Sequence, residues 1–95
     1  ANFAGTTDST DWVIKTNASE KARITANGAV ALGTAGPDTS AIIDMSSATQ
    51  GILLPRMTEA QRDAIVSPAT GMLLYNTTTN CLNLYDGTAW IAWCT

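Results

Sequence analysis

The chemistry open to this chain is narrow, because its 95 residues contain no histidine. A Ser–His or Cys–His nucleophile pair therefore cannot be built. The eight carboxylates are scattered along the chain rather than grouped in a motif: Asp8, Asp11, Glu20, Asp38, Asp44, Glu59, Asp63 and Asp86. The sequence predicts no catalytic residue, no metal ligand and no cofactor, and it makes an enzyme the least favoured function.

Covalent chemistry is open to the two cysteines, Cys81 and Cys94. We expect three antiparallel strands in this part of the chain, at 72–76, 81–85 and 90–94. If a four-residue loop joins the last two strands, Cys81 falls opposite Cys94, and opposed Cβ atoms lie about 4.5–5.5 Å apart, close to disulfide geometry. The alternative is a pair of reduced thiols, as expected for assembly in a reducing cytosol.

The same three strands form a meander with two distinct faces, because side chains alternate along a strand. With a three-residue loop at 77–79, one face is wholly apolar, and we predict it to be the core. Its members are Met72, Leu74, Leu82, Leu84, Ile91 and Trp93. The other face holds Leu73, Tyr75, Cys81, Asn83, Tyr85, Trp90, Ala92 and Cys94. A slip of one residue would mix the two sets.

Three aromatic residues on that second face, Tyr75, Tyr85 and Trp90, suggest a platform for a sugar. Aromatic rings offer flat apolar surfaces beside polar tips, which suits glycan binding. The alternative is that these rings pack against the N-terminal half or against a neighbouring subunit.

The segment 51–76 precedes and begins this meander. Residues 52–54 are contiguous and apolar, which predicts a strand covered on both faces. We expect Pro55 to end that strand, since it has no N–H for a ladder. Arg56 follows, and we expect its guanidinium to bridge backbone carbonyls or an acid of another chain.

A helix is expected from Thr58, its N-cap, to about Val66. Glu59 stands in the first turn, where the helix dipole favours an acid. Pro68 disfavours the helical conformation of the residue before it, so the helix cannot continue. The apolar positions fall on one stripe: Met57, Ala60, Ala64 and Ile65.

The N-terminal half reads as short strands separated by turns. We expect strands at 12–15, 22–26, 29–32 and 40–45, with a turn at 16–19. Asn27-Gly28 predicts a two-residue hairpin, because both residues accept positive φ.

Large apolar residues are sparse in the first fifty positions. Strands that offer one or two such side chains cannot offset about 1–2 kcal/mol of backbone entropy per residue, so they need cover from outside the chain. The candidates for subunit packing are Trp12, Ile14, Ile24, Ile42, Ile43, Leu53 and Arg56. The alternative is that residues 1–50 pack onto 51–95 within one monomer.

Composition excludes several partners. Charged residues are 14% of the chain, against about 25% in typical globular proteins. The net charge of −3 argues against nucleic acid, since phosphate binding needs a basic patch. No stretch approaches about 18 consecutive apolar residues, so we expect no membrane insertion.

Several stretches carry a family resemblance. They are GILLPRMTEAQRDAI at 51–65, SPATGMLLYNT at 67–77 and LNLYDGTAW at 82–90. Together they resemble a module of bacteriophage tail-fibre and other virion-fibre proteins, with related modules in bacterial fibrous surface proteins. Upstream, DWVIKTNASEKARITANGAVALGTAGP at 11–37 looks like the β-repeat that precedes this module in such fibres.

The resemblance implies a β-rich, homotrimeric, non-enzymatic structural subunit of a phage tail or head fibre or of an extracellular filament. We therefore expect a mainly β fold of short strands and hairpins, one short helix at about 58–66 and a C-terminal three-stranded antiparallel meander, completed by trimerisation. Residues 1–50 would form an extended fibre segment and 51–95 a strand-helix-meander module. The location would be a virion or a cell surface, and the partners other copies and other virion or filament proteins. The alternative function is a receptor- or glycan-binding tip that attaches to a host surface.

Overall fold

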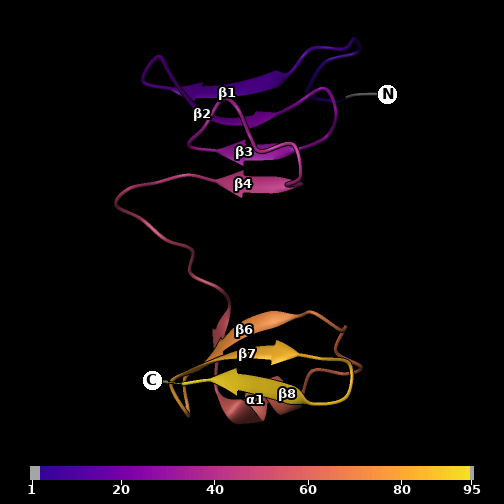
Figure 1. The fold of residues 1–95 in the computed structure, drawn as a ribbon, viewed down its shortest axis with the longest axis vertical. Helices are drawn as coiled ribbons and strands as arrows, with labels where there is room; N and C mark the ends of the chain where they lie inside the picture. Colours follow the sequence, from indigo (N-terminus) through magenta and orange to yellow (C-terminus); the bar gives the residue numbers. More distant parts are fainter. Residues whose placement is uncertain (1–2, 95) are drawn as a thin grey trace. The chain divides into compact units, whose positions relative to one another are not determined.

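The computed structural model describes residues 3–94. Within that range the chain forms eight β-strands in two four-stranded sheets, together with one short helix (Figure 1). The fold is therefore predominantly β, as the sequence predicts. The chain divides into two compact units, one ending at Gln50 and the other beginning at Gly51.

The sheet of the N-terminal unit has the spatial order β1-β2-β3-β4, the same as the order in sequence. The first three strands pair antiparallel, and β4 pairs parallel to β3. A β-bulge interrupts the β1–β2 ladder after Ile14. The bounds are β1 (Trp12–Thr16), β2 (Ser19–Ile24), β3 (Val30–Leu32) and β4 (Ile43–Met45). Strand β2 begins earlier than predicted, and β4 is shorter.

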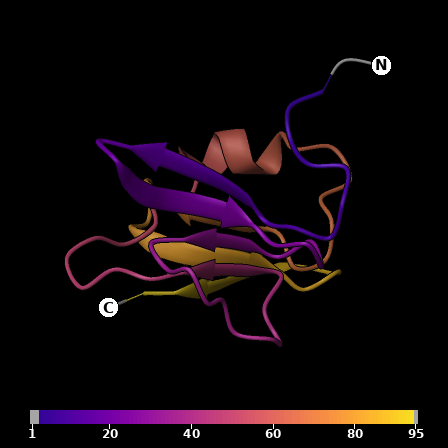
Figure 2. The ribbon, with the colours of Figure 1, turned by 90° about the horizontal axis from the view of Figure 1, so that it is seen from above.

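The two-residue turn of this sheet lies between β1 and β2, in the hairpin seen from above in Figure 2. Asn17 and Ala18 take positive φ values of 51° and 59°. Positive φ at both central residues defines the type I′ turn, whose twist matches that of the flanking strands. The sequence predicts a turn here, but the two-residue hairpin was expected at Asn27-Gly28.

The connection from β2 to β3 is longer than predicted. Of Asn27 and Gly28, Gly28 alone takes a positive φ, at 95°. The N–H of Gly28 donates to the Thr25 carbonyl at 2.9 Å, and the N–H of Thr25 donates to the Ala29 carbonyl at 2.9 Å. This is the three-residue hairpin loop closed by a glycine. Thr25 Oγ1 accepts from the N–H of Ala29 at 3.0 Å, a local bond that supports the wider loop.

The second unit holds a sheet of order β5-β6-β7-β8 and the helix α1. Strand β5 pairs parallel to β6, and the other two pairings are antiparallel. The bounds are β5 (Arg56–Met57), α1 (Glu59–Asp63), β6 (Leu73–Asn76), β7 (Cys81–Tyr85) and β8 (Trp90–Trp93). The predicted three-stranded meander is thus present and gains a short fourth strand.

The predicted strand at 52–54 is wrong. These three residues are not in a strand, and Leu53 is 77% exposed. Pairing begins at Pro55 instead, whose carbonyl accepts from the N–H of Tyr75 at 2.9 Å. Pro55 therefore does not end a strand but enters one, because its carbonyl remains free to accept even though it has no N–H.

Helix α1 starts where the sequence predicts and ends sooner. Thr58 is its N-cap, and a capping box forms: Gln61 N donates to Thr58 Oγ1 at 3.2 Å, and Thr58 N donates to Gln61 Oε1 at 2.9 Å. Two unpaired helix-end donors are satisfied reciprocally in this way. Ala64 is the C-cap, two residues before the expected end. Of the predicted apolar stripe, Met57 and Ile65 are partly buried, whereas Ala60 and Ala64 are exposed.

The pairing of β6 with β7 differs from the prediction by one residue. The loop between them has four residues, 77–80, because Asn76 pairs with Cys81. Asn80, with φ of 57°, supplies the left-handed residue at the end of this loop. Since side chains alternate, one extra loop residue moves every β6 side chain to the other face.

Candidate self-association surface

Strand β7 lies at the centre of the second sheet and separates two unlike faces. One face contains side chains that are almost fully enclosed: Leu74, Asn76, Cys81 and Asn83 are each no more than 2% exposed. Helix α1 lies on this side, since Glu59 and Arg62 reach Asn76 and Asn83. We call this side the helix-covered face.

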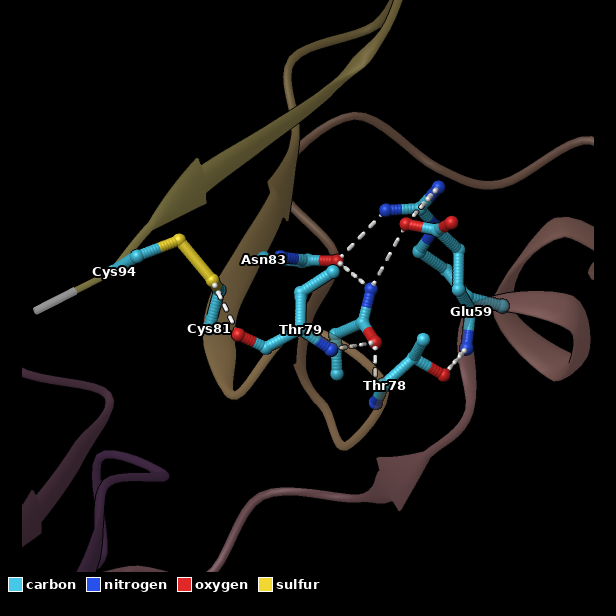
Figure 3. The surroundings of a disulfide bond; sticks show 8 residues. Glu59, Thr78, Thr79, Cys81, Asn83 and Cys94 are labelled. Atoms are coloured by element: carbon cyan, nitrogen blue, oxygen red, sulfur yellow. Dashed lines mark hydrogen bonds and ion pairs between the residues drawn. A yellow bond between two sulfur atoms is a disulfide. The ribbon is translucent and has the colours of Figure 1, made fainter.

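Two buried asparagines join the helix to the sheet. Asn76 Nδ2 donates to Asn83 Oδ1 at 3.2 Å and lies 3.5 Å from Glu59 Oε1. Arg62 Nη1 donates to the same Asn83 oxygen at 2.9 Å. Figure 3 shows Asn83 directed toward the helix that carries Glu59. These bonds replace the hydrogen bonds to water that the two amides lose on burial.

Asn76 also shapes the loop that follows it. Its Oδ1 accepts from the N–H groups of Thr78 at 3.0 Å and Thr79 at 3.3 Å. Thr78 Oγ1 in turn accepts from the N–H of Glu59 at 2.9 Å, in the first turn of the helix. The loop, the helix start and the buried amides therefore form one hydrogen-bonded unit, which explains why the loop has four residues.

The aromatic residues do not form the predicted platform. Tyr85 and Trp90 pair across β7 and β8, with ring centroids 5.1 Å apart and an angle of 62°. The guanidinium of Arg62 lies 5.5 Å from the Trp90 ring centroid, within cation–π range. Tyr75, however, pairs with Leu82 and lies on the opposite side of the sheet. The three rings therefore cannot contact one ligand together.

A disulfide joins Cys81 to Cys94, with the two Cα atoms 4.6 Å apart (Figure 3). It follows from the β7–β8 register, in which Leu82 pairs with Trp93 and Tyr85 with Trp90. The four-residue loop that sets this register is held by Asp86, whose carboxylate accepts from the N–H groups of Thr88 and Ala89, each at 2.8 Å. These backbone donors, that of Ala89 first, hold the pKa of Asp86 below its usual range.

The other side of the sheet is apolar and is not covered by the helix; we call it the open face. It consists of Leu73 and Tyr75 on β6, Leu82 and Leu84 on β7, and Ile91 and Trp93 on β8. Leu73, Ile91 and Trp93 are 43%, 40% and 52% exposed. Arg56 pairs with Tyr75 at the edge of the sheet and is exposed.

The predicted core is therefore wrong in two respects. Because of the longer loop, Leu74 and Met72 lie on the helix-covered face and not on the same face as Leu82 and Leu84. The apolar residues of β7 and β8 do share a face as predicted. That face, however, is the one the protomer leaves open.

Among residues 3–94, no three His, Cys, Asp or Glu side chains gather in a way that would hold a metal ion. No helix in this part of the chain is long and apolar enough to cross a membrane.

The family described as “Phage tail like trimerisation region” matches residues 31–95, more than half of the chain. The chain belongs to this family. No curated protein and no solved structure matches the chain. The match confirms the resemblance to phage tail-fibre modules and supports a structural role in a trimeric fibre. The trimerisation region covers the whole second unit, with its open face, and begins inside strand β3 of the first unit.

The remaining packing candidates lie at different places. Four of them, Trp12, Ile14, Ile24 and Ile43, share one side of the N-terminal sheet. Ile42 directly precedes β4 and is 77% exposed. Leu53 lies in the extended stretch before β5. These placements leave their role in subunit packing as a proposal.

Sequence reasoning missed the polar anchoring of the helix by Arg62, Asn76 and Asn83. A signal was available in the pattern Thr58-x-x-Gln61, a capping box that fixes where the helix begins. A second was Asn76 followed by Thr78, an arrangement typical of a side chain that folds a turn onto itself.

Proposed function

We propose that this chain is a non-enzymatic structural segment of a homotrimeric fibre, in which three copies associate through the open face. The observation that supports the proposal is an apolar sheet face without cover, inside a region that belongs to a trimerisation family. Monomeric soluble proteins rarely expose contiguous apolar patches of this kind, and larger ones mark interaction sites.

The two faces suit different tasks. The helix-covered face is closed by hydrogen bonds and a disulfide, so it holds the protomer together without the open face. The open face is then free to contact other copies. Arg56 is exposed at the rim of this face. We expect it to pair with an acid or a carbonyl of a neighbouring copy, because guanidinium groups pair with such acceptors at interface edges.

The fibre would be part of a virion, such as a phage tail, or of an extracellular filament. Its neighbours along the axis would be other fibre proteins. A receptor- or glycan-binding tip is the less favoured function, because Tyr75 lies on the opposite side of the sheet from Tyr85 and Trp90. A glycan array, with Trp90→Ala as the control, distinguishes a glycan-binding tip from a structural segment of the fibre.

The experiment compares two charge substitutions in the full chain. Ile91→Glu places a carboxylate on the open face, and Val66→Glu places one at a residue that is 88% exposed beyond the helix. We expect light scattering to give a trimer for Val66→Glu and a protomer of 9.9 kDa for Ile91→Glu, because a desolvated unpaired carboxylate is costly.

A trimer that survives Ile91→Glu would contradict the proposed interface. Circular dichroism and an intact disulfide check that the protomer still folds. Folding is expected, because Ile91 is 40% exposed in the protomer and its substitution leaves the helix-covered face unchanged.

A further inference from the structure

We infer that the N-terminal unit carries a second self-association face, one side of the β1–β4 sheet, which packs against the same side of two other copies. The inference rests on the proposed trimeric assembly. It adds a contact that includes residues outside the matched trimerisation region.

On this side, the register of the N-terminal sheet places apolar residues everywhere except beside the β1–β2 turn, where Thr16 pairs with Ser19. Trp12 pairs with Ile24, which pairs with Val30, which pairs with Ile43. A second row runs across the same strands from β1 to β4. The eight residues are Trp12, Ile14, Ala22, Ile24, Val30, Leu32, Ile43 and Met45. We call them the second apolar face.

The second apolar face is open in the protomer. Ile14 and Ile24 are 39% and 38% exposed, Leu32 is 42% exposed, and Ile43 and Met45 are 53% and 47% exposed. Scattered exposed apolar residues are ordinary on a protein surface. Eight apolar residues that are contiguous across four hydrogen-bonded strands are not, and they indicate a contact surface.

The charged residues of the sheet lie on its other side. Arg23 bonds the carboxylate of Asp11 at 2.7 Å and also pairs with Glu20. Ala31, between Arg23 and Asp44 in the ladder, is fully buried. That side is therefore closed by the chain's own groups, whereas none of the eight residues of the second apolar face is charged.

The occupant of this face follows from where the trimerisation region begins. Its first matched residue is Ala31, in the middle of β3. Leu32, Ile43 and Met45 thus belong both to the trimerisation region and to the second apolar face. The face continues across hydrogen-bonded strands into β2 and β1, each about 4.8 Å farther on. A copy that packs on β3 and β4 therefore also reaches Ile24 and Ile14.

The chemistry of the face fits another copy of itself. An uncharged apolar surface needs an equally apolar partner, since a polar partner would lose hydration without compensation. Copies that are already joined through residues 51–95 present this surface at a high effective concentration, so the second contact costs little additional entropy.

The test measures how accessible the face is in the assembled protein. Two variants of the full chain, Ile14→Cys and Ile43→Cys, place a thiol on the face. Lys15→Cys is the control for Ile14→Cys, because side chains alternate along a strand and Lys15 lies on the other side of β1. Ile42→Cys is the control for Ile43→Cys, because Ile42 lies just outside β4 and is 77% exposed in the protomer. The native disulfide leaves the introduced thiol as the free one. Maleimide labelling is timed under native conditions, and light scattering gives the mass of each sample.

We expect Ile14→Cys and Ile43→Cys to label about tenfold or more slowly than their neighbours, and all four to label alike in denaturant. Loss of the trimer in the two face variants alone would also support the inference. A trimer in which all four label at similar rates overturns the second face and leaves the proposed function intact. Monomers in all four variants overturn both, including monomers in which the face is protected by the rest of the same chain.

Discussion

The two buried asparagines decide the register of the C-terminal sheet. Asn76 forms hydrogen bonds with Asn83 and with two loop N–H groups only when it lies under the helix. A one-residue slip of β6 would move Asn76 to the open face and put Tyr75 beneath the helix. Asn83 Nδ2 has no hydrogen-bond partner among the described residues. Burying a polar group without a hydrogen-bond partner is costly. The two hydrogen bonds that Asn83 Oδ1 accepts must therefore offset the cost of burying this side chain.

The disulfide should stabilise the C-terminal unit. Cys81 and Cys94 are 13 residues apart, and closing such a loop contributes on the order of 3 kcal/mol in the chain-entropy model. Complete reduction, shown by alkylation of both thiols, should lower the midpoint of thermal unfolding by on the order of 10 °C. Cys81→Ala combined with Cys94→Ala should unfold at the lower temperature and not respond to reductant. An unchanged midpoint after complete reduction would contradict this role.

The cysteine pair was predictable because it depends on one loop only. The loop 86–89 was read correctly, since Asp86 and Gly87 are turn residues that fix its length. The aromatic platform depended on two loops at once, and the error in the first one separated Tyr75 from the other rings.

Among the elements, the position of β6 shows where sequence reasoning fails. A three-residue loop would give a wholly apolar face, and that regularity favours the register predicted from the sequence. The four-residue loop instead joins Tyr75 and Leu73 to the same apolar set. An apolar pattern identifies a face that avoids water, but it does not distinguish the protomer's own core from a surface that another copy covers.

The connection between β3 and β4 begins at Gly33, and its backbone path requires a glycine there. Its φ is 79°, and a Cβ at this position would collide with the backbone carbonyl oxygen of Ser46. Gly33→Ala should destabilise the N-terminal sheet by about 1–3 kcal/mol, because a strained backbone and a backbone clash act together. The measurement is hydrogen exchange of the β2–β4 amides.

Gly36→Ala is the matched control for that substitution. Gly36 lies in the same connection, has no positive φ, and has no heavy atom within 4 Å of a built Cβ. Its exchange protection should stay within about 0.5 kcal/mol of the parent. Equal protection in the two variants would show that the close approach of Gly33 to Ser46 is not needed.

At the scale of the whole chain, each unit has one side closed by its own groups and one apolar side left open. The fold class, the helix start and the β7–β8 register were predictable, because local patterns and turn residues determine them. The strand expected at 52–54 is absent. A run of apolar residues predicts burial, but it does not show whether the residues are buried in a strand of the same chain or against another chain. Local sequence patterns do not specify which apolar faces stay exposed in the protomer, because that depends on contacts with other copies.

We expect three copies to bury these open sides together. The most direct test is the mass of the unmodified chain in solution at micromolar concentration, measured by sedimentation equilibrium. The mass should be about three times the 9.9 kDa of the protomer, as expected for a closed threefold assembly. A well-folded species at the protomer mass, unchanged as concentration rises, would contradict it.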